Sequence, residues 1–182
     1  ALSLLQQRMP AWVSQHVTAQ QANLALERGD VAGAAHVLAQ SGISSDDPCD
    51  HRTEVIQTAY LRLLLHRGRE APDAAHLPAA IDLADRLLTA AEAASRMGRV
   101  IELLILRSLA RAALGETPAA LADLGRALAL AEPEGYVQVF LNEGEPMRAL
   151  LAQFARSAHP AGEPDAVRLV AYAHALLNPG AG

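Results

Sequence analysis

The 182-residue sequence contains no lysine, and all fifteen of its basic residues are arginine. This absence excludes a Schiff-base lysine, a Ser–Lys dyad and the lysine of a phosphate-binding loop. The net charge is −5 and the arginines are spread singly, so no basic stripe is present to neutralise phosphates. We therefore expect no direct nucleic-acid binding by this segment.

Cysteine and long apolar runs are equally scarce. The single cysteine, Cys49, cannot form an internal disulfide, and Cys49-Asp50-His51 lacks the second ligand pair of a zinc site. The apolar runs fall far short of the roughly 20 residues that span a bilayer, and residues 1–5 lack the charged start of a signal peptide. We therefore expect a cytoplasmic protein with no membrane partner, metal or other cofactor.

The ionisable residues form no pattern typical of a catalytic centre. The seven histidines include no pair at i, i+3 or i, i+4 spacing, which is how a helix presents two ligands to a metal. The glutamates cluster beside predicted helix ends, where carboxylates usually serve as caps; they are Glu132, Glu134, Glu143 and Glu145. We therefore do not expect an enzyme.

Alanine and leucine are abundant, with 39 and 29 residues, whereas aromatic residues make up only 3% of the chain. Alanine and leucine favour helices, and the residues that strands favour are scarce. The apolar periodicity and the Gly and Pro punctuation predict an all-α protein. We expect helices over residues 11–28, 31–40, 52–67, 79–95, 99–114 and 118–131, and shorter ones at about 135–143, 146–157 and 164–177.

Single residues predict where several helices begin and end. Asp30 and Thr117 are expected to be N-caps, and Pro78 is expected in the loop before its helix. Glycine is expected to end long helices or to mark the break between them, at Gly29, Gly68, Gly98 and Gly115.

The helices pair by repetition. If the glycine that ends each long helix is position 15 of a 34-residue tetratricopeptide-like unit, small residues and leucine recur where paired helices touch. They are Ala22, Ala34 and Leu38, then Ala80, Ala84 and Leu87, then Ser108, Ala120, Leu124 and Ala127. We expect one domain over residues 1–182, a right-handed superhelix of antiparallel helix pairs with units at about 11–41, 52–95 and 99–132 and capping helices at 135–177.

One string near the third unit resembles a known family. Residues 127–147 read ALALAEPEGYVQVFLNEGEPM, and residues 12–38 with Ser44–Pro48 follow the same family order more weakly. This resembles the helical-repeat domain of large ATP-dependent LuxR-type transcription regulators, of the maltose-regulon-activator type. Within the string, Tyr136, Val139 and Phe140 share one helical face and are expected to cap the last repeat.

The resemblance implies a signal-receiving and oligomerising domain, cut from a longer regulator whose nucleotide-binding and helix-turn-helix parts are not in this sequence. Its partners would be a small-molecule inducer or regulatory protein, the other domains of the regulator, and further copies of itself. The alternative is a general interaction scaffold that binds a peptide or partner domain and senses no metabolite.

If the units stack as tetratricopeptide-like hairpins, their first helices line a groove, and six polar residues there could bind an inducer or partner. They are His16, Asn23, Glu27, Arg62, His66 and Glu102. The same residues also suit an ordinary solvated face. The third unit's lining (Ile105, Leu109, Ala112 and Ala113) is apolar, which favours a hydrophobic or helical guest unless C-terminal helices cover it. We expect Trp12 to be a core plug, although a groove could use it for stacking.

Overall fold

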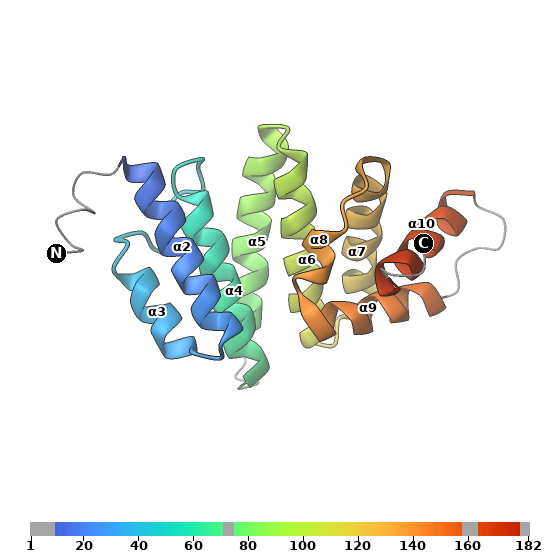
Figure 1. Cartoon of the computed structure of the whole chain (residues 1–182), viewed down its shortest axis with the longest axis horizontal. Helices are drawn as coiled ribbons and strands as arrows, with labels where there is room; N and C mark the ends of the chain where they lie inside the picture. Colours follow the sequence, from blue (N-terminus) through green and yellow to red (C-terminus); the bar gives the residue numbers. More distant parts are fainter. Residues whose placement is uncertain (1–9, 71–74, 158–163, 179–182) are drawn as a thin grey trace. The chain divides into compact units, whose positions relative to one another are not determined.

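A computed structural model describes residues 10–70, 75–157 and 164–178, and the secondary structure in these ranges is entirely helical (Figure 1). The helices are α2 (Ala11–Glu27), α3 (Val31–Ala39), α4 (Glu54–Glu70), α5 (His76–Ala93), α6 (Met97–Ala113), α7 (Thr117–Ala131), the 3₁₀ turn η1 (Glu132–Glu134), α8 (Gln138–Leu141), α9 (Gly144–Arg156) and α10 (Pro164–Leu177). The predicted all-α class is confirmed. The segments around Pro72, Pro160 and Pro179, which punctuate the sequence, lie outside the described residues.

The chain divides into two compact units, Ala1–Ala90 and Ala91–Gly182, with the boundary inside α5. In the first unit, α2 packs against α3 and α4, and α3 packs against α4. In the second, α6 pairs with α7, α9 contacts both of them, and α10 contacts α7 and α9. The single domain with three hairpin units, and the right-handed superhelix in which they stack, stay predictions.

The small residues that the repeat pattern placed at helix contacts are buried. In the first unit, Ala22, Ala34 and Leu38 are fully buried in one core with Ile56 and Leu63 of α4. Small side chains let helix axes approach closely, and the leucines fill the remaining space. The other predicted contact residues are buried as well: Ala80, Ala84, Leu87, Ser108, Ala120, Leu124 and Ala127.

A charged cluster joins α6 to α7 inside the second unit. Asp123 is buried and accepts hydrogen bonds from the Arg107 guanidinium at 2.5 and 2.8 Å and from the Arg111 guanidinium at 2.8 Å. Buried charges are tolerated in a core when they are paired in this way. The three residues hold the helix pair together and leave the Asp123 carboxylate neutralised.

The predicted helix ends at Gly29 and Gly115 and the predicted N-cap at Asp30 are confirmed, whereas the predicted N-cap at Thr117 is wrong. Gly29 and Gly115 adopt left-handed backbones, with φ of +76° and +80°, and Asp30 Oδ1 accepts a hydrogen bond from the Gly33 amide at 2.8 Å. By contrast, Thr117 is the first residue of α7 and not its N-cap. The N-cap is Glu116, whose side chain makes no capping hydrogen bond.

Gly68 does not end α4, as the sequence predicted, because the helix continues to Glu70. Gly68 is buried, and a β-carbon built on it would lie 2.5 Å from Leu77 Cγ at the start of α5. The glycine therefore allows a close approach between two helices and does not stop one. Pro78 likewise lies in the first turn of α5, which begins at His76, and not in the preceding loop.

The break between α5 and α6 occurs at Ser95 and not at Gly98. Ser95 has φ of +54°, and Gly98 lies in the first turn of α6. Further along, α8 spans only four residues, whereas the sequence predicted a helix at about 135–143, and Gly144 begins α9. Of the three predicted capping residues, Phe140 is fully buried, Val139 is half-buried and Tyr136 is 41% exposed.

Candidate functional site on helix α2

The exposed face of α2 carries an open hollow of about 430 Å³. Small-molecule sites in proteins typically enclose roughly 300–1,000 Å³, so the hollow is large enough for a metabolite-sized ligand. It is lined by His16, Val17, Gln20, Gln21, Leu24 and Glu27.

The position of the hollow follows from the way α2 packs. Ala19, Ala22 and Leu26 are buried, and their spacing places them on one face of the helix. The lining residues occupy the opposite side, where Val17 is 37% and Leu24 is 45% exposed. The α2 helix therefore presents apolar side chains on both faces, and only one of these faces is covered within the first unit.

The polar groups of the hollow offer more acceptors than donors. His16 Nδ1 lies 2.8 Å from the Trp12 carbonyl oxygen, which can only accept, so Nδ1 carries a proton and donates this hydrogen bond. Glu27 adds carboxylate acceptors, and Gln20 and Gln21 add amides that both donate and accept. This arrangement suits a ligand that has several hydrogen-bond donors and an apolar part.

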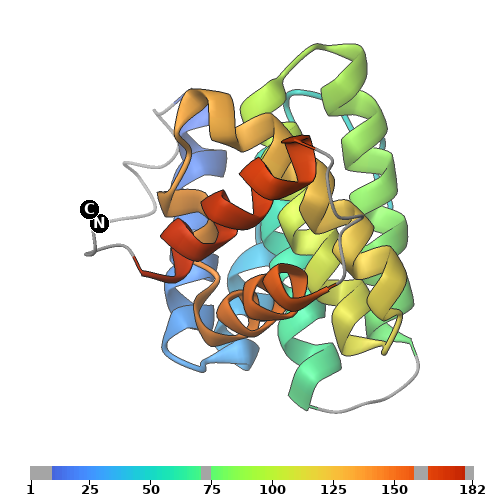
Figure 2. The same cartoon turned by 90° about the vertical axis from the view of Figure 1, so that its right-hand side faces the viewer.

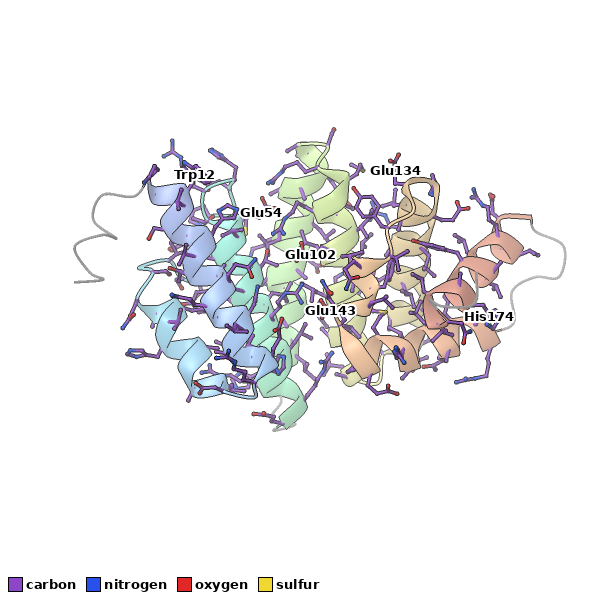
Figure 3. All side chains as sticks on the ribbon, viewed as in Figure 1. Trp12, Glu54, Glu102, Glu134, Glu143 and His174 are labelled. Atoms are coloured by element: carbon purple, nitrogen blue, oxygen red, sulfur yellow. The ribbon has the colours of Figure 1, made fainter. Side chains whose placement is uncertain are left out.

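Trp12 is 65% exposed, so the prediction that it plugs the core is wrong (Figure 3). It shares a helical face with Ala19 but precedes that residue, the first buried one of α2, by two turns. Its ring meets the His16 ring edge-on, with the centroids 6.1 Å apart. Trp12 thus lies next to one end of the hollow.

The structure brings two of the six predicted groove residues, His16 and Glu27, into the hollow. Asn23 is half-buried on α2, and its buried carboxamide oxygen has no hydrogen-bond partner among the described residues. The other three lie on other helices, are half-buried, and are each engaged in an interaction: Arg62 and His66 on α4, and Glu102 on α6, where it binds Arg99. A common ligand site for all six residues stays a prediction.

The apolar residues expected to line the groove at the third predicted repeat (residues 99–132) do not form an open groove. Ile105 and Leu109 are buried within the second compact unit of the chain, where α9 contacts α6. Of the other two, Ala112 is half-buried and Ala113 is exposed. The apolar pattern in this helix therefore reflects the protein core and not a hydrophobic guest.

Sequence reasoning missed four of the lining residues, Val17, Gln20, Gln21 and Leu24. On α2 the repeat numbering selected His16, Asn23 and Glu27, and of these Asn23 is half-buried and outside the lining. One signal was present in the sequence, since apolar residues of α2 fall on both sides of the helix. That pattern indicates that α2 has a second apolar surface, besides its core-facing side, that favours contact with a ligand or partner.

The other reactive groups support no catalytic role. Burial raises the pKa of the Cys49 thiol, although the Arg86 guanidinium, 3.7 Å from its sulfur, acts in the opposite direction, so the thiol is not an activated nucleophile. The described part of the chain contains no group of three or more His, Cys, Asp or Glu residues that could hold a metal ion. Within the same residues, no helix combines the length and the apolar character needed to cross a bilayer.

Comparisons with known proteins identify the family. The search of curated proteins and the search of solved structures found no significant match. The model of the MalT-like TPR region matches residues 2–157, which is most of the chain and includes α2 through α9. The resemblance to this helical-repeat domain, expected from the sequence, is confirmed, and the chain belongs to the MalT-like TPR region family.

Proposed function

We propose that this chain is the signal-receiving and oligomerisation domain of a cytoplasmic LuxR-type transcriptional regulator, and that it binds its inducer or regulatory partner in the hollow on α2. A tetratricopeptide-like repeat is a non-catalytic scaffold type, and no enzymatic activity is proposed for it. The family assignment supports a regulatory domain, and the hollow is the observation that carries the choice of site.

The proposed mechanism is thermodynamic linkage. A ligand that binds one state of the domain more tightly than another shifts the population toward the first state, and the domain then favours the assembled form. His16 and Glu27 would fix the orientation of the ligand, because they place polar groups at opposite ends of the lining. Val17 and Leu24 would cover its apolar part.

A thermal-shift screen of sugars, acyl compounds and aromatic metabolites tests the proposal. A ligand at 100 times its dissociation constant stabilises the folded form by about 2.7 kcal/mol, which corresponds to a rise of roughly 5–10 °C for a chain of this size. Sedimentation velocity with and without the ligand then tests whether binding changes the assembly state.

Two substitutions test whether the ligand binds in the hollow on α2. Gln20→Ala should weaken binding of the ligand at least several-fold, because it removes an amide from the lining. Gln153→Ala is the matched control, since Gln153 is also an exposed glutamine within a helix, α9, and is not among the lining residues of the hollow. Equal affinity in the wild type and both variants would place the ligand elsewhere and contradict the assignment.

A scaffold that binds a peptide or partner domain is the second candidate. The exposed side chains of Trp12 and Leu24 favour it, because large apolar groups at the surface are typical anchors of protein interfaces. A screen in which no metabolite moves the melting temperature, together with a partner whose binding is lost in Trp12→Ala, would support this candidate over the first.

A further inference from the structure

Side chains of the C-terminal helix α10, which is drawn in red in Figure 2, make three contacts with one segment of the second unit. This segment is η1 and α8 together (residues 132–141) and is termed the η1–α8 corner. The Arg168 guanidinium lies 3.1 Å from the Glu132 carboxylate. The Tyr172 hydroxyl donates a hydrogen bond to the Tyr136 carbonyl oxygen. The Tyr172 ring also packs edge-on against Phe140, with the centroids 6.2 Å apart. Two side chains one turn apart on α10 thus hold three positions along the corner.

The η1–α8 corner has little stability of its own. The α8 helix has only four residues, far fewer than an isolated helix needs to persist in water. Gly135 and Gly144, with φ of +68° and +66°, lie at the two places where the chain turns. Phe140 is the one fully buried side chain of the corner, and it is the residue that Tyr172 covers. The order of the corner therefore depends on the helices that it contacts, which include α7, α9 and α10.

The α10 helix, which packs on α7 and α9, buries few of its own side chains. Of its described side chains, only those of Ala173 and Leu176 are buried, whereas α6 has nine buried residues. The Arg168 side chain is 49% exposed, so its ion pair with Glu132 is screened by water and contributes little. The family match also ends at residue 157, before α10 begins. Segments with few buried contacts open at a lower free-energy cost than the core around them.

From this combination we infer that α10 is a detachable strap for the η1–α8 corner. In the docked state it orders the corner, and in the undocked state α10 and the corner lose order together while α6 and α7 remain folded. The strap is the output element of the signal-receiving domain, so this inference rests on the proposed function above. A signal acts on it by changing the docked fraction.

The proposal that α10 is a detachable strap is tested by hydrogen–deuterium exchange of the full chain. The exchange is measured by mass spectrometry without any ligand. Tyr172→Phe removes the hydroxyl that reaches the corner and should speed exchange in α10 by about 2- to 10-fold, the effect of one ordinary hydrogen bond. Residues 132–141 should speed up by the same factor, because they open with α10. Exchange in α6 should not change.

Tyr136→Phe is the matched control. It makes the same chemical change within the corner but keeps the backbone carbonyl that Tyr172 uses, so α10 should exchange at the wild-type rate. Three outcomes for Tyr172→Phe would contradict the proposal that α10 is a detachable strap. They are faster exchange throughout α6, faster exchange in α10 without faster exchange in the corner, and no change in either segment. Because no inducer is present in this experiment, its outcome is independent of whether the hollow on α2 binds one.

Discussion

Gly68→Ala is expected to destabilise the first unit even though alanine is the better helix former. Within a helix, alanine is favoured over glycine by up to about 1 kcal/mol. Here the new β-carbon would lie 2.5 and 2.6 Å from two carbons of Leu77, and Leu77 is only 5% exposed, so it cannot turn into solvent. Overpacking of this kind costs about 1–3 kcal/mol. The net expectation is a loss of roughly 1–2 kcal/mol.

Urea unfolding followed by far-ultraviolet circular dichroism measures this effect, and a second substitution isolates its cause. Leu77→Ala alone should cost about 2–5 kcal/mol because it leaves a cavity. In the Leu77→Ala background, Gly68→Ala should become neutral or stabilising, since the atoms that its β-carbon meets are gone. A gain of stability from Gly68→Ala in the native background, or an equal loss in both backgrounds, would refute the close-approach explanation.

Three further predictions concern the second unit. Ser95→Gly should raise stability by about 1 kcal/mol and the melting temperature by a few degrees, because Ser95 has φ of +54°, where a β-carbon is unfavourable; an unchanged melting temperature would contradict this. Asp123→Ala should cost about 3–5 kcal/mol in urea unfolding because it removes the buried carboxylate that Arg107 and Arg111 share, whereas Asp165→Ala, at an exposed ion pair, should cost less than about 1 kcal/mol, and similar losses would refute the difference. Burial, aided by the charge of Glu132, raises the pKa of Tyr172 to about 12, so its contribution to stability is complete below pH 10 and is lost as the pH rises from 10 to 12. Tyr172→Phe should lose less stability than the wild type over that range, and equal losses would count against this assignment.

The hollow on α2 could be predicted only in part. His16 and Glu27 are among the groove residues that the repeat numbering predicts, and both lie in the hollow. Gln20 and Leu24 are not, because neighbouring positions along a helix point about 100° apart, and the numbering selected other positions of α2. The burial of Ile105 and Leu109 depends on the helices that pack in the second unit, which no local pattern specifies.

The sequence by itself determined the all-α class, the ends at Gly29 and Gly115, and the small residues that paired helices bury. These features are local: helix propensity, a left-handed backbone at glycine and a period of 3.6 residues act over a few neighbouring positions. Tertiary structure alone decided that Gly68 is a contact point within a helix and that Trp12 faces solvent. Both depend on which helix arrives at a given place from elsewhere in the chain, and that is set by packing across the core, where the same residue can be buried or exposed according to its neighbours.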